Sequence, residues 1–195
     1  AGKLSWGLGQ ILYILKTSIL YITSLVIAAI LPFLGHITWS NEWGKIWGTL
    51  GKTNTGADFG VKLSVSQNII RQYKPVDALV ISILLEFSCI LCIGLLIYFG
   101  NKITAKSIGT FAGTLIAVLD ICVSNDWLDW AYGFSPVSLT QLELFHGFAS
   151  KWGINLVYAE KFFMIAIVSL SVLCVIANYK ETVISRMKER HIHGK

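Results

Sequence analysis

Glu86 is the residue whose type and position carry the clearest chemical meaning, because it lies inside the apolar stretch 78–99. A charged side chain at the centre of a bilayer costs about 3 kcal/mol on insertion scales, so it packs against a partner, lines water or carries charge. Asp120 and Lys16 lie nearer the ends of two other apolar stretches. We interpret the three as a relay for ions or protons, ordered by depth as Asp120, Glu86 and Lys16 from outside to inside, or as buried polar groups. In the second interpretation Lys16 and Asp120 reach the two water interfaces and only Glu86 is too deep to do so.

Cys89 and Cys92 form the second pattern, two thiols three residues apart on one helical face. A reactive pair of this kind needs thiolate character and an electropositive, partly exposed setting. Here the pair lies in an apolar stretch, three residues from a carboxylate. We therefore expect buried cysteines that behave as small apolar side chains.

Motifs for other chemistry are absent from the sequence. It has no phosphate-binding glycine loop, no HExxH pair and no Ser/His/Asp set. We therefore predict no catalytic residue and no metal site, favour a function other than catalysis, and assign no cofactor.

The composition indicates which elements position these residues. Of the 195 residues 54% are hydrophobic and 14% are charged, whereas soluble domains average about 25% charged residues. About 20 apolar residues are needed to cross a bilayer as a helix. We predict an all-α integral membrane protein, a single domain built as a bundle of four transmembrane helices. The predicted spans are 11–34, 78–99, 105–124 and 162–179.

Two extended extracytoplasmic loops, 36–75 and 125–161, connect these spans, and 180–195 forms a charged tail. In the second loop, Ser138-x-x-Gln141 is a capping-box pattern that predicts the start of an amphipathic helix. The N-terminal stretch, the turn between the middle spans and the tail hold eight of the 16 Lys and Arg residues in short segments. Basic segments favour the cytoplasmic side, so we place both termini of this multi-pass protein in the cytoplasm.

Small residues recur every fourth position in the third predicted span. Such a ladder lets two helices approach closely in lipid. We expect a tight helix–helix contact, either within the chain or between subunits. The ladder consists of Ala105, Gly109, Gly113 and Ala117.

Six of the seven tryptophans lie in the two outer loops. They form a belt at the level of the lipid headgroups or anchor a contact with another protein. These outer-loop contact candidates are Trp39, Trp43, Trp47, Trp127, Trp130 and Trp152.

The general plan, with both ends inside and a longer first than second outer loop, resembles that of tetraspan proteins. The claudins, a tetraspan family, also have a Trp-rich first loop, but the Trp43–Trp47 segment lacks the cysteine pair of that loop. The net charge of +5 comes mainly from Lys and Arg flanking the spans, so we expect no nucleic-acid partner.

We predict a non-catalytic subunit that packs into a larger secretion, transport or energy-transducing complex in the lipid bilayer, through other membrane subunits or self-association. One alternative is a small proton- or ion-coupled channel or carrier that uses Glu86. A second is a membrane thiol–disulfide oxidoreductase.

Overall fold

A computed structural model of the chain describes residues 3–34, 40–45, 47–49, 67–104, 107–125, 127–146 and 153–193. The fold is all-α, as predicted, and the described residues contain no strand. Short elements join the long helices: α3 (Gln67–Gln72) and the 3-10 turns η1 (Leu31–Phe33), η3 (Asp129–Phe134), η4 (Ser138–Thr140) and η5 (Leu144–His146). The four long helices are α1 (Lys3–Ile30), α4 (Pro75–Thr104), α5 (Ile108–Ser124) and α6 (Leu156–His193).

Three of these helices are long and apolar enough to cross a membrane: α1 over Ser5–Ile30, α4 over its whole length, and α6 over Leu156–Tyr179. These three helices support the prediction of a membrane protein. The third predicted span corresponds to α5, an apolar helix of 17 residues. At 1.5 Å per residue α5 is ~25 Å long, less than the ~30 Å thickness of a hydrocarbon core.

Three helices, α1, α4 and α6, extend at one or both ends beyond the apolar windows from which they were predicted. The first begins at Lys3 instead of residue 11. It ends at Ile30, directly before the 3-10 turn η1, which contains Pro32. Proline removes a backbone donor and so ends a helix. In α6, residues 180–193 of the predicted tail continue the helix. Backbone hydrogen bonding continues through these polar ends, which a hydropathy window does not detect.

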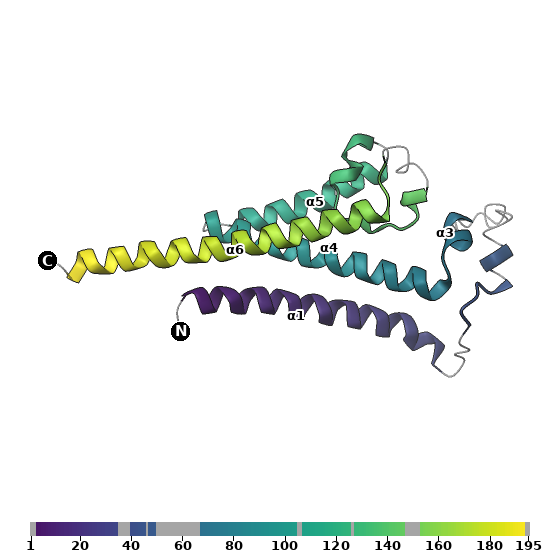
Figure 1. Ribbon diagram of the computed structural model, residues 1–195, viewed down its shortest axis with the longest axis horizontal. Coiled ribbons are helices and arrows are strands. Elements are labelled where there is room, and N and C mark those ends of the chain that lie inside the picture. Colours follow the sequence, from purple (N-terminus) through teal and green to yellow (C-terminus); the bar gives the residue numbers. More distant parts are fainter. Residues whose placement is uncertain are drawn as a thin grey trace.

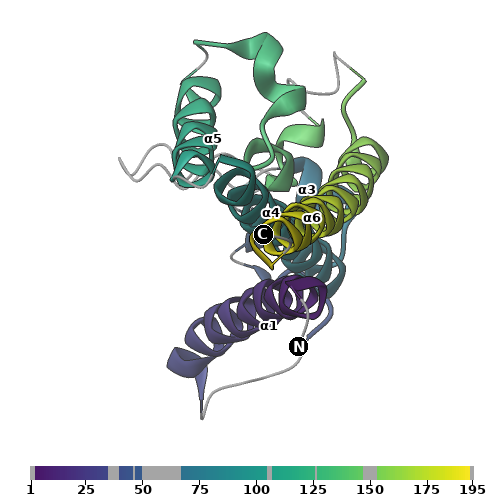
Figure 2. The ribbon, with the colours of Figure 1, turned by 90° about the vertical axis from the view of Figure 1, so that its left-hand side faces the viewer.

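The long helices alternate in direction, so the N- and C-termini lie at the same end of the molecule (Figure 1). We call this the terminal end and the opposite end the loop end. Viewed along the bundle, α4 and α6 form the centre, while α1 and α5 lie on opposite sides of it (Figure 2). Accordingly α4 packs mainly on α6 and α5, and α1 packs on both α6 and α4.

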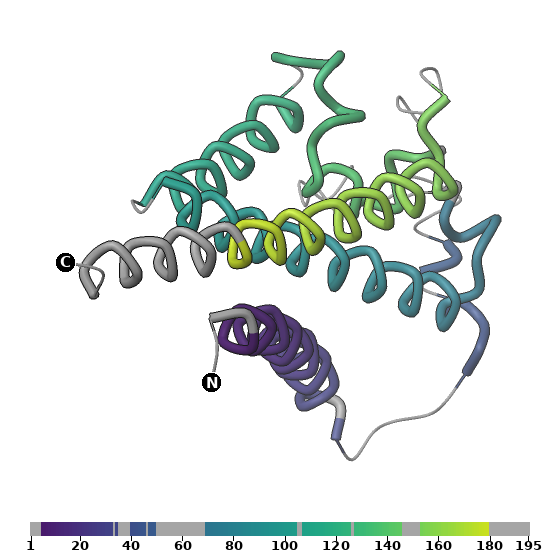
Figure 3. Tube along the Cα trace, turned by 60° about the vertical axis from the view of Figure 1, so that its left-hand side comes forward, coloured from purple at the N-terminus to yellow at the C-terminus, as the bar shows by residue number. Residues whose placement is uncertain are grey.

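The segment 127–146 fills the space between α5 and α6 at the loop end (Figure 3). Leu139, Leu142 and Phe145 are buried there against side chains of α4, α5 and α6. The amphipathic helix predicted from Ser138 is wrong for the described part, because 138–146 forms the two short turns η4 and η5 instead. The Ser138 hydroxyl makes no cap and is engaged by another side chain, as described below. Residues 147–152 lie outside the described residues.

Two members of the small-residue ladder pack within the chain, against α4. A Cβ atom added to Gly109 would collide with the Ile97 carbonyl oxygen, and one added to Gly113 would lie 2.9 Å from the Ile97 side chain. Ala117 is exposed, since four residues advance a helix by about 400° and the ladder turns out of the contact. The fourth member, Ala105, lies outside the described residues.

A side chain of α4 also caps the start of α5. The N-cap residue Ser107 makes no side-chain cap, but the Asn101 Oδ1 atom accepts a hydrogen bond from the Thr110 backbone N–H at 3.2 Å. The Asn101 amide donates to the Thr110 hydroxyl at 3.2 Å as well. Because a free backbone donor at a helix start needs a partner, this contact helps to fix the α4–α5 turn.

A buried asparagine joins α1, α4 and α6 near the terminal end. Asn178 is 1% exposed, and its Oδ1 atom accepts a hydrogen bond from the Tyr98 hydroxyl at 3.1 Å. Its amide donates to the Cys174 carbonyl at 2.7 Å. On the other side lies Gly7, where an added Cβ atom would be only 2.5 Å from the Asn178 side chain.

Candidate functional site

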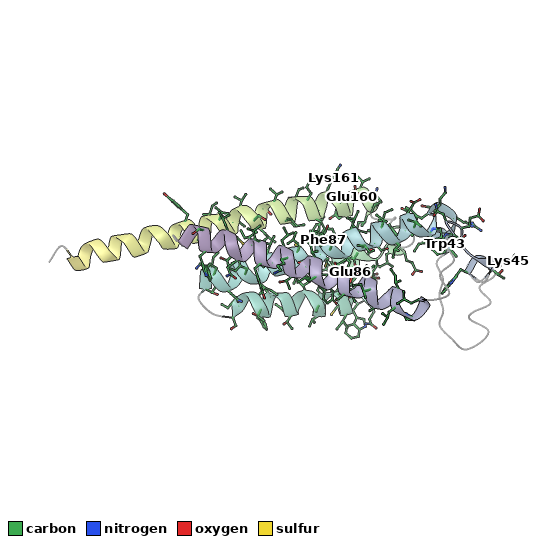
Figure 4. All side chains as sticks on the ribbon, turned by 90° about the horizontal axis from the view of Figure 1, so that it is seen from below. Trp43, Lys45, Glu86, Phe87, Glu160 and Lys161 are labelled. Carbon is green, nitrogen blue, oxygen red and sulfur yellow. The ribbon has the colours of Figure 1, made fainter. Side chains whose placement is uncertain are left out.

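Glu86 lies in a groove between α1 and α4. The groove has a volume of about 200 Å³ and is open at the surface. Glu86 is exposed and lies near the middle of the helices, far from the loop-end residues Trp43 and Lys45 (Figure 4). The other seven lining residues are all apolar: Ile22, Leu25, Val26, Ala29, Ile30, Leu79 and Ile83.

No described residue forms an ion pair with Glu86. The deep cation of α1, Lys16, is exposed and precedes Ile22, a residue of the groove, by six positions. At 1.5 Å per residue, Lys16 lies ~9 Å nearer the terminal end than Ile22 and the groove. The described residues therefore leave an open carboxylate at the depth of the apolar helices without a counterion.

Asp120 has a different environment, because segment 127–146 closes over it. Its Oδ1 atom accepts a hydrogen bond from the Ser138 hydroxyl at 2.8 Å. The Ser135 hydroxyl lies 2.8 Å from that of Ser138, and both serines are fully buried. The Tyr132 hydroxyl donates to the Ser138 carbonyl at 3.2 Å. Burial, and secondly the charge of Asp120, raise the pKa of Tyr132 above its usual range, so this phenol stays neutral and continues to donate.

The cluster around Asp120 is a structural joint between α5 and the loop, which leads to the first prediction. Replacing Ser138 with Ala should lower the free energy of unfolding by about 2 kcal/mol, because a buried bond to a charged acceptor is lost. Chemical denaturation in mild detergent measures this change. The control is Ser169→Ala, which removes an exposed hydroxyl bonded only within its own helix and should change stability by less than about 0.5 kcal/mol. Equal effects of the two substitutions would show that the joint contributes nothing specific.

The structure does not bring Glu86, Asp120 and Lys16 onto one path. Glu86 opens to the α1–α4 groove, Asp120 is held on the α5 side by Ser138, and Lys16 lies on the exposed surface of α1. Asp120 lies about one turn before the end of α5 at Ser124.

The cysteine pair on α4 is buried. Cys89 and Cys92 are both free thiols within the core formed by α4, α5, α6 and segment 127–146. A partner thiol has no access to them in this arrangement. In the part of the chain that the structure describes, no group of three or more His, Cys, Asp or Glu side chains is placed to hold a metal ion.

The described outer-loop tryptophans fall into two groups. Trp43 is half-buried and its indole N–H donates to the Tyr73 carbonyl at 2.8 Å, which fastens the first loop to the start of α4. Trp47, Trp127 and Trp130 are exposed, the last two by 72% and 66%. The remaining two, Trp39 and Trp152, lie outside the described residues.

Sequence reasoning missed two features. Asn178 was not singled out, although an amide beside an apolar run is the signal that could have identified it. Glu160 lines a second pocket, of about 310 Å³, between α4 and α6. The predicted fourth span began at residue 162, so Glu160 was assigned to a loop. The observed helix begins at Leu156, which places Glu160 in its second turn.

Comparison of the chain with known protein families, curated proteins and solved structures finds no match.

Proposed function

We propose that this chain is a non-catalytic subunit that packs into a larger membrane assembly. The observation that carries the proposal is the exposed Glu86 in an otherwise apolar groove at the depth of the spanning helices. Left against lipid, a charged group at the membrane centre costs about 3 kcal/mol. A partner helix that covers the groove and supplies a hydrogen-bond donor or a cation removes most of that cost.

The aromatic side chains at the loop end support the same role. Trp127, Trp130 and Phe134 are all more than 60% exposed and follow one another along a single short segment. Exposed aromatic side chains are typical of the anchors of protein interfaces and of residues at the headgroup level. In a secretion, transport or energy-transducing complex they provide contact area outside the hydrocarbon core.

We propose further that the terminal end faces the cytoplasm. The start of α1, the end of α4 with the start of α5, and the part of α6 beyond Tyr179 lie together at this end (Figure 1). In the sequence, the N-terminal stretch, the turn between the middle spans and the tail contain eight basic residues in short segments. Basic residues close to the ends of spans set the orientation of a membrane protein. Labelling of cysteines introduced at the two ends of the molecule in sealed membranes tests this orientation.

Substitution of Glu86 tests the proposed role. In cells, affinity purification of the tagged wild-type chain in mild detergent should recover membrane proteins in fixed ratio to it. Glu86→Gln should reduce that recovery about tenfold, the equivalent of one interhelical polar contact. Glu143→Gln, at an exposed carboxylate in segment 127–146, is the matched control and should leave recovery unchanged. A strictly monomeric wild-type chain that recovers no membrane protein would contradict the proposal.

A small proton- or ion-coupled carrier is the second candidate, favoured by the open access to Glu86. Reconstituted vesicles separate the two functions. A carrier would show proton or cation flux from the purified chain alone, and Glu86→Gln would abolish the flux. A subunit that acts only through its assembly would show no flux in either form.

A further inference from the structure

One face of α1 carries a regular stripe of side chains that the described residues leave largely exposed. Its members are spaced alternately four and three residues apart, which places them on one side of the helix. The same spacing marks the residues of a helix that contact a neighbour in a supercoiled pair. Val26 is half-buried, and the other five are exposed. The stripe consists of Leu12, Lys16, Ile19, Thr23, Val26 and Ile30.

The stripe leads into the groove that contains Glu86. Val26 and Ile30 belong to both, since they line the groove together with Glu86. Figure 2 shows α1 and α5 on opposite sides of α4, so that neither helix crosses the other. A helix that packs along the stripe of α1 would therefore also cover Glu86.

The charge of the groove selects the chemistry of such a helix. Glu86 is the one charged residue among the eight that line the groove. An apolar helix placed over an ionised carboxylate would bury that charge without a partner, at a large cost. A Lys or Arg side chain would instead form a charge-assisted hydrogen bond with it.

We propose that the groove between α1 and α4 receives a transmembrane helix of a different protein, which carries a basic side chain at the level of Glu86. The inference rests on the proposed role as a subunit and identifies the contact through which that role is exerted. The helix lies along the stripe from Leu12 to Ile30, and its basic group binds the Glu86 carboxylate.

A second copy of this chain fits the groove less well. In a pair related by an axis along the membrane normal, equivalent residues keep the same depth. Lys16 lies ~9 Å to the terminal side of Glu86, at 1.5 Å per residue. Lys161 lies on α6 at the edge of the molecule away from Glu86 (Figure 4), whereas the eight described lining residues of the groove belong to α1 and α4. Because the two copies of such a pair present the same face to each other, neither lysine meets Glu86.

Synthetic helices test the inference directly. The purified full chain, labelled with a fluorescent donor, is reconstituted into phosphatidylcholine vesicles with acceptor-labelled Leu/Ala peptides of about 24 residues, long enough to span. One peptide carries a single central Lys, a second has Leu at that position and a third has Glu. Energy transfer at increasing lipid dilution gives the affinity of each peptide. We expect the Lys peptide to bind about tenfold more tightly than the Leu peptide, the gain of one polar contact in lipid.

Variants of the chain locate the contact. Glu86→Gln should abolish the preference for the Lys peptide, and Glu86→Lys should transfer it to the Glu peptide. Glu143→Gln should leave the preference unchanged. Moving the lysine of the peptide by six positions towards the level of Lys16 should abolish tight binding. Equal affinity for the Lys and Leu peptides, or a preference that survives Glu86→Gln, would overturn the inference. So would self-association of the chain that depends on Glu86 and excludes the Lys peptide, because a second copy would then fill the groove.

The two proposals fail in different ways. If the chain binds the Lys and Leu peptides with equal affinity but still recovers membrane proteins from cells, it is a subunit that binds its partners through another surface. If the Lys peptide binds through Glu86 while the chain in cells is monomeric, the groove has the inferred chemistry but the proposed role as a subunit is lost.

Discussion

Replacement of Gly109 by Leu is expected to separate α5 from α4 and to lower the free energy of unfolding by about 3 kcal/mol, the upper end of the range for an overpacked interior. Gly109 is buried, and an added Cβ atom would meet the Ile97 carbonyl and the Asn101 backbone nitrogen. Backbone atoms of a helix cannot move aside as a flexible side chain can, so the two helices must move apart. The same movement breaks the cap that Asn101 provides for the start of α5. Unfolding in mild detergent, followed by circular dichroism, measures the loss.

Ala117 provides the matched control for this substitution, because it belongs to the same small-residue ladder but is exposed. Ala117→Leu should change the stability of the isolated chain by less than about 0.5 kcal/mol. The opposite ranking, with Ala117→Leu the more harmful of the two, would show that the ladder faces another subunit and not α4.

Replacement of Gly7 by Leu should detach the start of α1 from α6 and lower the free energy of unfolding by about 2 kcal/mol. The side chain would enter the space occupied by Asn178, which is fully buried and bonded to Tyr98 and Cys174. To make room, Asn178 would have to leave its hydrogen bonds, and a buried amide without partners is costly. Thermal unfolding in detergent measures the effect.

Gly9 lies two residues further along α1 and has open space around it, with nothing within 4 Å of an added Cβ atom. Gly9→Leu should therefore be neutral or slightly stabilising, because Leu has a higher helix propensity than Gly. If the two substitutions lowered the melting temperature equally, the junction of Gly7 with Asn178 would not hold α1 in place.

The helical parts of the fold could be predicted from the sequence because they depend on local properties. An apolar run such as 78–99 must form a helix in lipid, where every backbone group needs a partner within the segment. The ends were harder to place, since the polar first turns of α1 and the continuation of α6 beyond Tyr179 lie outside any apolar window. The helix predicted from Ser138 is wrong in its described part because Ser138 binds Asp120, 18 residues away, and does not cap its own turn. A local pattern cannot indicate such a choice of partner.

For the candidate site, the sequence indicated the residue but not its surroundings. The depth of Glu86 followed from its place in an apolar stretch. Which neighbour it faces depends on how α1 packs on α4, and this is set by close contacts such as that of Gly94 with Ile14. The ladder shows the same limit. Its spacing predicted a close contact, but only the structure shows that Gly109 and Gly113 face α4 while Ala117 does not.

The most direct test of the account is photo-crosslinking from inside the groove in native membranes. A photoreactive amino acid replaces Ile83, which lines the groove, and in a second variant it replaces Ile165, which is 69% exposed on α6. We predict a discrete protein adduct from position 83 that disappears when Glu86→Gln is added, and no such adduct from position 165. Adducts to lipid alone at position 83, or a protein adduct that is unaffected by Glu86→Gln, would contradict the claim that a partner helix covers this carboxylate.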